Sequence, residues 1–80
     1  MSAKDKVLAS QLKTKIVLFL KSSQKATFKD IKDNVNISTD ALKIQLDDLQ
    51  RDGVITRIRG KYMLTELGVK IAEELEQKRS

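Results

Sequence analysis

The chain has 80 residues, of which 40% are hydrophobic and 34% are charged, a balance typical of a folded domain and not of a disordered segment. It contains no cysteine and no histidine, which excludes disulfides, thiol catalysis, the usual structural zinc sites and imidazole acid–base chemistry. No paired-carboxylate or glycine-rich phosphate motif is present, so the sequence predicts neither an enzyme nor a cofactor or metal site.

The hydrophobic pattern predicts no membrane association. The longest uninterrupted run of large apolar residues, at positions 16–20, falls well below the ~18 residues of a membrane span. The first five residues lack the basic segment and hydrophobic stretch of a signal peptide. We therefore expect a cytoplasmic protein, and no residue pattern marks a small-molecule pocket.

The net charge of +5 is unevenly distributed along the chain. Residues 1–33 contribute +5 and residues 54–65 contribute +3, whereas residues 34–53 contribute −2 and residues 66–80 contribute −1. A basic excess of this kind suits nucleic acid or another acidic surface, and lysine-rich solubility is the alternative explanation.

A first helix is predicted from about Lys4 to Lys21, because apolar residues recur there at helical spacing. A loop follows at residues 22–25. Thr27 then offers an N-cap with Asp30 three residues on, a shortened capping box that begins a short second helix. The apolar positions of these two helices are Leu8, Leu12, Ile16 and Phe19, then Phe28, Ile31 and Val35.

A tight connection at residues 34–37 leads to a third helix, which Ser38 caps and whose core face is Leu42, Leu46 and Leu49. Gly53 is well placed to end it, since glycine takes the left-handed conformation without strain. Residues 54–65 alternate β-branched or aromatic with polar side chains, which predicts a β-hairpin with its turn at residues 59–61. Thr65 caps a last helix, from about Glu66 to Lys78.

The order of helix, short helix, tight turn, capped helix and hairpin is that of a winged helix-turn-helix. The segments "TFKDIKD", "ISTDALKIQLDDLQRDGVI" and "YMLTELG" resemble the winged-helix domains of small bacterial and archaeal transcription regulators of the MarR and ArsR type. The resemblance covers about residues 14–75. It implies a mainly α (α+β) fold with three helices, a hairpin wing and a C-terminal helix, and sequence-specific binding of double-stranded DNA. The cysteine and histidine ligands of metal-sensing ArsR-type proteins are absent.

We expect a single domain over residues 1–80. Its parts are the first helix with a dimerisation extension at 1–22, the helix-turn-helix at 27–53, the wing at 54–65 and the last helix at 66–80.

The resemblance makes the third helix the recognition helix. Its tip, with Ser38, Thr39 and free backbone N–H groups, suits a phosphate, and Lys43 reaches a phosphate or a guanine edge. Its outward face also carries Asp40, Ile44 and Asp47.

The negative charge of this helix has two explanations. Asp40 complements the helix dipole and Asp47 stands four residues before Arg51, whereas Asp48 and Asp52 lack a strong local role. Alternatively, Asp40 or Asp47 accepts a hydrogen bond from a cytosine amino group. Ile44 is either ordinary exposed surface or a contact to a thymine methyl group.

The hairpin carries the strongest local signal for DNA. Arg57, Arg59 and Lys61 surround Gly60 with no acid to offset them, so their charges are expected to project together toward a DNA backbone or minor groove. The alternative is a charged strand edge that resists aggregation. Three lysines in and just before the second helix are expected to add backbone contacts: Lys25, Lys29 and Lys32.

The terminal helices predict a homodimer, because their apolar residues exceed what one small core readily buries. The residues assigned to this interface are Val7, Leu8, Leu12, Val17, Leu18, Leu67, Ile71 and Leu75. A winged helix also serves as a protein-docking module, in which case the acidic third helix would bind a basic protein and no DNA.

Overall fold

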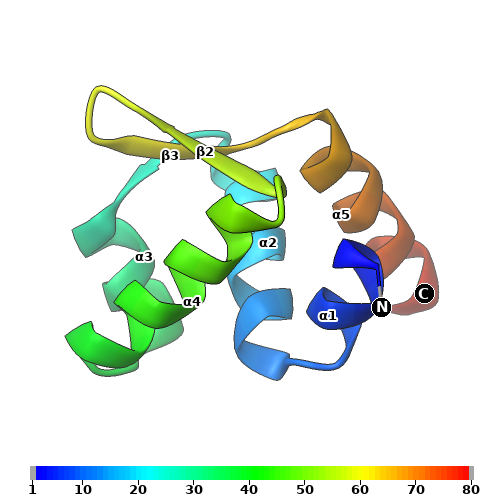
Figure 1. Ribbon diagram of the computed structural model, residues 1–80, viewed down its shortest axis with the longest axis horizontal. Helices are drawn as coiled ribbons and strands as arrows, with labels where there is room; N and C mark the ends of the chain where they lie inside the picture. Colours follow the sequence, from blue (N-terminus) through cyan, green and yellow to red (C-terminus); the bar gives the residue numbers. More distant parts are fainter. Residues whose placement is uncertain (1, 80) are drawn as a thin grey trace.

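The computed structural model describes residues 2–79 and shows helices arranged around a small antiparallel sheet (Figure 1). None of the helices in this range combines the length and hydropathy that a bilayer-spanning segment requires. In chain order the elements are α1 (Ala3–Leu8), α2 (Gln11–Ser23), β1 (Ala26–Thr27), α3 (Phe28–Val35), α4 (Thr39–Arg51), β2 (Ile55–Ile58), β3 (Lys61–Leu64) and α5 (Glu66–Arg79).

The predicted first helix is two helices, which corrects the sequence interpretation. The backbone is extended at Ser10, whose hydroxyl accepts a hydrogen bond from the Lys13 N–H and so caps α2. The Thr14 hydroxyl donates to the Val7 carbonyl at 2.9 Å and satisfies an acceptor at the end of α1. The chain therefore turns between α1 and α2, and α1 folds back as a separate element.

The helix-turn-helix forms as predicted. Thr27 and Asp30 make a reciprocal capping box at the start of α3, and Asn36 ends this helix in the left-handed conformation at φ +60°. Ser38 caps α4 by accepting from the Ala41 N–H. Gly53, at φ +77°, ends α4: its N–H and the N–H of Val54 donate to the carbonyls of Gln50 and Leu49, a Schellman motif.

The sheet has the strand order β1-β3-β2 and is antiparallel throughout. Arg59 and Gly60 connect β2 to β3 with positive φ at both residues, as a two-residue type I′ hairpin turn requires. Strand β1 was not predicted, because a segment of two residues carries no periodicity; it pairs Ala26 with Tyr62.

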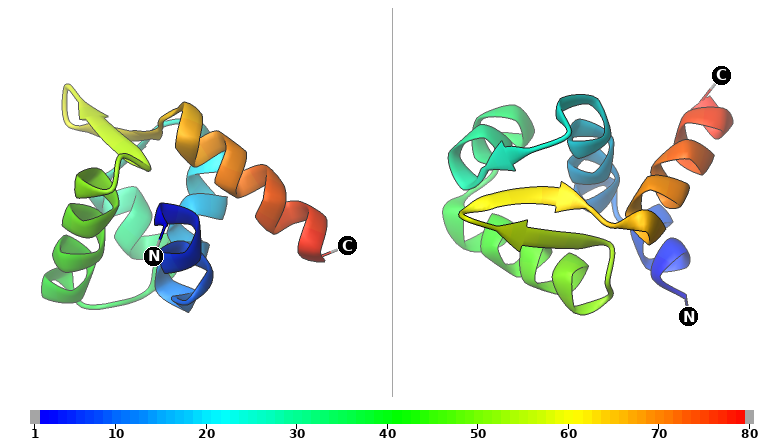
Figure 2. Two further views of the ribbon diagram at one scale, coloured as in Figure 1. Left: turned by 45° about the vertical axis from the view of Figure 1, so that its right-hand side comes forward. Right: turned by 90° about the horizontal axis from the view of Figure 1, so that it is seen from above.

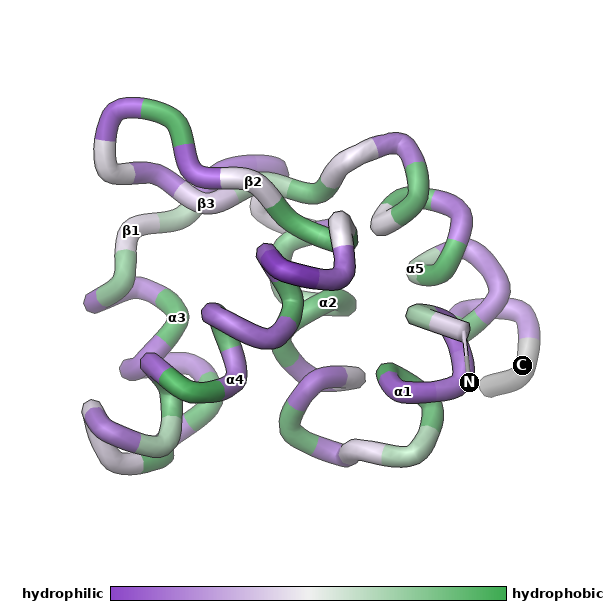
Figure 3. Tube along the Cα trace, viewed as in Figure 1, coloured by the Kyte–Doolittle hydropathy of each residue, from purple (hydrophilic) through white to green (hydrophobic). Residues whose placement is uncertain are grey.

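The core lies around α2, which contacts α1, α3, α4, α5 and β3. Hydrophobic and hydrophilic positions alternate along the helices and along the hairpin (Figure 3). The largest side chains with less than 2% exposure are Val7, Ile16, Val17, Leu20, Ile31, Leu42, Leu46, Leu49, Val54 and Ile71.

The start of α5 packs closely against the loop that follows α4. The Thr65 hydroxyl accepts from the Gly68 N–H, which confirms the predicted cap, and it donates to the Gly53 carbonyl. Gly68 is buried here because α5 approaches the backbone carbonyl of Val54. This junction holds together the end of α4, the base of the hairpin and α5.

Candidate nucleic-acid interface

The outward face of α4 carries the side chains that were predicted for it. Asp40, Lys43, Ile44 and Asp47 are all exposed, with Ile44 exposed to 59%. They lie opposite the buried leucines of the same helix, as the helical period requires. One face of α4 is thus free for a ligand over its first three turns.

At the tip of α4, the Ser38 hydroxyl oxygen accepts the Ala41 N–H, and its own hydrogen stays available to a phosphate. Thr39 is exposed beside it. The positive end of the helix dipole and two hydroxyl groups therefore coincide at this point.

The hairpin and α4 share one groove. It has a volume of about 370 Å³ and is lined by Phe28, Lys43, Asp47, Arg57 and Tyr62. Arg57 and Tyr62 are cross-strand partners, and the guanidinium carbon of Arg57 lies 5.5 Å from the centre of the Tyr62 ring. This cation–π contact holds Arg57 beside α4, so that the groove has one cation on the helix and one on the hairpin.

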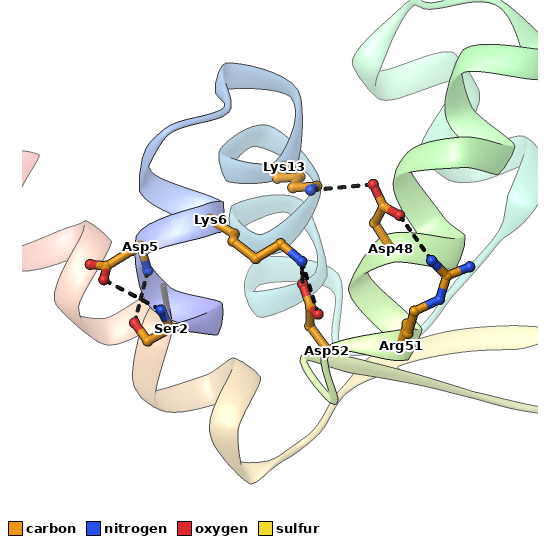
Figure 4. Close-up of polar contacts among 7 residues, drawn as sticks. All are labelled: Ser2, Asp5, Lys6, Lys13, Asp48, Arg51 and Asp52. Atoms are coloured by element: carbon orange, nitrogen blue, oxygen red, sulfur yellow. Dashed lines mark hydrogen bonds and ion pairs between the residues drawn. The ribbon is translucent and has the colours of Figure 1, made fainter.

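Asp48 of α4 and Asp52, the C-cap of this helix, point toward lysines of the N-terminal helices (Figure 4). The Asp52 carboxylate lies 2.8 Å from the Lys6 ammonium, and the Asp48 carboxylate lies 3.5 Å from the ammonium of the largely buried Lys13. These pairs neutralise the acids that lacked a strong local role in the sequence. The negative charge at the end of α4 therefore serves to orient the helix against α1 and α2.

The predicted pairing of Asp47 with Arg51 does not form. Within residues 2–79 Asp47 makes no ion pair, and Arg51 instead lies 4.0 Å from Asp48. Asp47 is left as a free acceptor on the wall of the groove.

The cations of the hairpin do not project together as expected. Successive residues of a strand point to opposite faces, so Arg57 lies on the face of the sheet that carries Tyr62, and Lys61 lies on the other face. Arg59 occupies the turn at φ +54°. The alternation of side chains along each strand could be read from the sequence. The predicted turn, at residues 59–61, was one residue too long, and the turn sets which residues pair across the strands.

Lys29 lies in the first turn of α3 and is exposed, with no ion pair among the described residues. A cation at this end of a helix opposes the dipole, so its position has no local stabilising role. It is free to contact an anion.

The residues predicted for a dimer interface occupy three environments. Leu8 and Leu67 are exposed to 36% and 42%, and Leu12 and Leu18 pack partly buried against the core. The other four are enclosed by the chain itself, which corrects their assignment, because a side chain buried in its own core has no surface to offer a partner. These four are Val7, Val17, Ile71 and Leu75. Val7 enters the core because α1 folds back as a separate helix against α2, and the other three are buried where α2 and α5 belong to the core.

A helix-turn-helix followed by a hairpin that borders the outward face of its second helix defines a winged-helix domain, the fold of many DNA-binding transcription regulators. The sequence of residues 4–78 matches the family described as "Methanogenesis regulatory protein FilR1, N-terminal domain". The chain belongs to this family, which is one of regulatory domains and not of enzymes.

Three solved structures have the same fold. Ligand-free NadR is 25% identical to the chain at a TM-score of 0.82, over 86% of this chain and 52% of NadR. A Mycobacterium tuberculosis MarR family protein is 19% identical at a TM-score of 0.79, over 95% of this chain and 59% of that protein. The type III plasmid segregation protein TubR is 19% identical at 0.75, over 94% of this chain and 82% of TubR.

The chain thus spans little more than half the length of the first two proteins. A comparison with curated protein sequences found no match.

Proposed function

We propose that the chain binds double-stranded DNA sequence-specifically and acts as a transcriptional regulator, with α4 in the major groove and the hairpin on the neighbouring backbone and minor groove. The observation that carries this proposal is the groove that α4 and the hairpin share, with Lys43 and Arg57 on its two walls. The DNA backbone that separates the major groove from the minor groove would lie in this groove of the protein, with its phosphates between the two cations.

Base reading is assigned to the outward face of α4. Lys43 suits a guanine edge or a phosphate, and Ile44 suits a thymine methyl group. Asp40 and Asp47 are the acceptors on this face, and either would favour the amino group of cytosine. Ser38, Thr39 and Lys29 are assigned to phosphates, which position the helix and carry no sequence information.

The charge distribution predicts weak nonspecific binding of DNA, with different contributions from α4 and from the hairpin. Residues 34–53 have a net charge of −2, so α4 contributes little long-range attraction to DNA. The hairpin, with three cations and no acid, supplies most of it. Because Asp48 and Asp52 pair with Lys13 and Lys6, the acids at the end of α4 do not oppose this attraction directly.

A salt titration of binding to a random duplex tests the proposal. Binding is expected to weaken steeply as salt rises, since each phosphate contact contributes about 0.9 to the slope of log K against log salt. A winged-helix module that docks only proteins predicts no measurable duplex binding at ~0.1 M salt, and that result would overturn the proposal. Selection from a random pool, after binding is established, then reads the preferred site.

We further propose that the chain forms a homodimer through α1 and α5. These two helices lie side by side, away from the tip of the hairpin (Figure 1), and the Lys4 ammonium joins them by an ion pair to Glu74 at 2.8 Å. The hydrogen bond in this pair raises the pKa of Lys4. The exposed Leu8 and Leu67 supply apolar surface on the same two helices, and the arrangement leaves α4 and the hairpin uncovered.

Light scattering at micromolar concentration is expected to show twice the 9.1 kDa mass of one chain. Leu67→Glu should convert the dimer to a monomer, because it places a charge in the proposed interface. Ile44→Glu, at an exposed apolar residue of α4, is the matched control and should leave the dimer intact. A mass of one chain for the unchanged protein would rule the dimer out.

A further inference from the structure

The two faces of the hairpin have different surroundings. Strand pairing places Ile55, Arg57, Tyr62 and Leu64 on the face that looks toward the core and α4. The opposite face, which we call the outer wing surface, carries Thr56, Ile58, Lys61 and Met63. Seen from above, no helix covers this face (Figure 2, right).

A cationic depression lies on the outer wing surface and extends beyond it to neighbouring residues. Its volume is about 430 Å³, and it is lined by Lys25, Ile58, Arg59, Lys61 and Met63. Three of these five residues are cations and none is an acid. Within residues 2–79 none of the three cations makes an ion pair, so their charge is available to an external anion.

Lys25 has no part in the hairpin itself. It precedes β1, which pairs with β3, and the register of Ala26 with Tyr62 places Lys25 beside Met63. The short strand β1 thereby extends the cationic surface from the turn at Arg59 back along the sheet. A two-stranded hairpin alone would offer only Lys61 and Arg59 on this side.

We propose that the outer wing surface binds phosphates of the far strand of the minor groove that the hairpin enters. The inference rests on the proposed DNA binding. The minor groove is only about 6 Å wide, so only the turn enters it, and the strands behind the turn stand above the groove with one face toward each of its two backbones. One face of the hairpin then meets each strand: Arg57 the near one, Lys61 and Lys25 the far one.

The apolar part of the surface fits the same ligand. Ile58 is 55% exposed and stands next to the turn, between Arg57 and Arg59 in the sequence. Apolar side chains at such positions contact deoxyribose or enter between base steps in the minor groove. An acidic protein segment would also suit cations with an apolar floor. DNA is favoured because the same four-residue strands carry Arg57 on their other face, in the groove shared with α4.

The test compares Lys25→Gln/Lys61→Gln with the unchanged chain in a salt titration on a 30-base-pair AT-rich duplex, a length of roughly three helical turns. The slope of log K against log salt is expected to fall in magnitude by about 1.8, since each lost phosphate contact removes about 0.9. Lys15→Gln/Lys70→Gln is the matched control, because it also removes two exposed positive charges, from α2 and α5. Its slope should equal that of the unchanged chain.

A second arm fills the minor groove with netropsin before the protein is added. The difference between the unchanged chain and Lys25→Gln/Lys61→Gln is expected to disappear, because the surface then has no second strand to reach. If the unchanged chain binds no duplex, the proposed function itself fails. If it binds, but the Lys25/Lys61 variant behaves like its control, only the present inference is overturned. The present inference is also overturned if that variant binds an alternating glutamate–leucine peptide less tightly than the unchanged chain does, but binds DNA equally well.

Discussion

Gly68→Ala is expected to destabilise the domain by about 2 kcal/mol or more, although alanine is the better helix former by about 1 kcal/mol. A Cβ atom at this position would overlap the backbone carbonyl oxygen of Val54 and press on the Leu64 side chain at 3.0 Å. The Val54 carbonyl cannot move aside as the end of a flexible side chain can, because its oxygen accepts a hydrogen bond from the Thr65 N–H. The start of α5 would have to shift away from the hairpin.

Gly53→Ala and Gly60→Ala separate this steric effect from backbone strain. Both glycines have positive φ, and an added Cβ meets open space at each. Their expected cost is about 1 kcal/mol, from the left-handed conformation alone. Urea unfolding followed by circular dichroism measures all three variants. A Gly68→Ala protein as stable as the unchanged chain would show that α5 does not approach Val54 as closely as described.

The local elements could be predicted from the sequence because their signals are local. The capping pairs of Thr27 and Ser38 act over three residues, and a glycine such as Gly53 marks a left-handed position by itself. The break at Ser10 had such a signal too, since serine is a strong N-cap. It was overlooked because the apolar period of Leu8, Leu12 and Ile16 continues across it.

The partners of the aspartates in α4 could not be predicted, because they are set by tertiary packing. Lys6 is 46 positions from Asp52, and no pattern in the sequence couples them. Lys6 stands beside the end of α4 only because α1 folds back, and Lys13 reaches Asp48 from α2. The two acids, which looked unfavourable in a DNA-binding helix, therefore help to hold α4 in place. The same fold-back encloses Val7, which a single long helix would have left for a dimer partner.

The functional surface is consequently less acidic than the helix that carries it. Asp48 and Asp52 are directed to Lys13 and Lys6, and the face toward the groove keeps Asp40 and Asp47 with Lys43. If the proposed function holds, the attraction to DNA comes mainly from the hairpin, and α4 mainly distinguishes sequences. Substitutions in the hairpin should then change the affinity for any DNA sequence, and substitutions on the outward face of α4 should change which sequence is preferred.

Arg57→Glu/Arg59→Glu is expected to lower duplex affinity by about 100-fold at ~0.1 M salt, because each reversal costs about 1.4 kcal/mol of binding free energy. The groove then carries an acid in place of the Arg57 guanidinium, and the turn presents a second acid, at position 59, to the phosphates. Fluorescence anisotropy with a labelled duplex measures the affinity. The fold should persist, since the contact of Arg57 with the Tyr62 ring is worth only about 0.5–1 kcal/mol at an exposed site.

Lys15→Glu/Lys70→Glu changes the net charge by the same amount at exposed sites on α2 and α5 and serves as the control. If net charge alone governed binding, both double variants would lose affinity equally, and the hairpin would have no special role. A loss confined to the Arg57/Arg59 variant places the attraction at the hairpin. If that variant bound DNA as tightly as the unchanged chain, the hairpin would not be the main source of the attraction, because two of its three cations would contribute nothing.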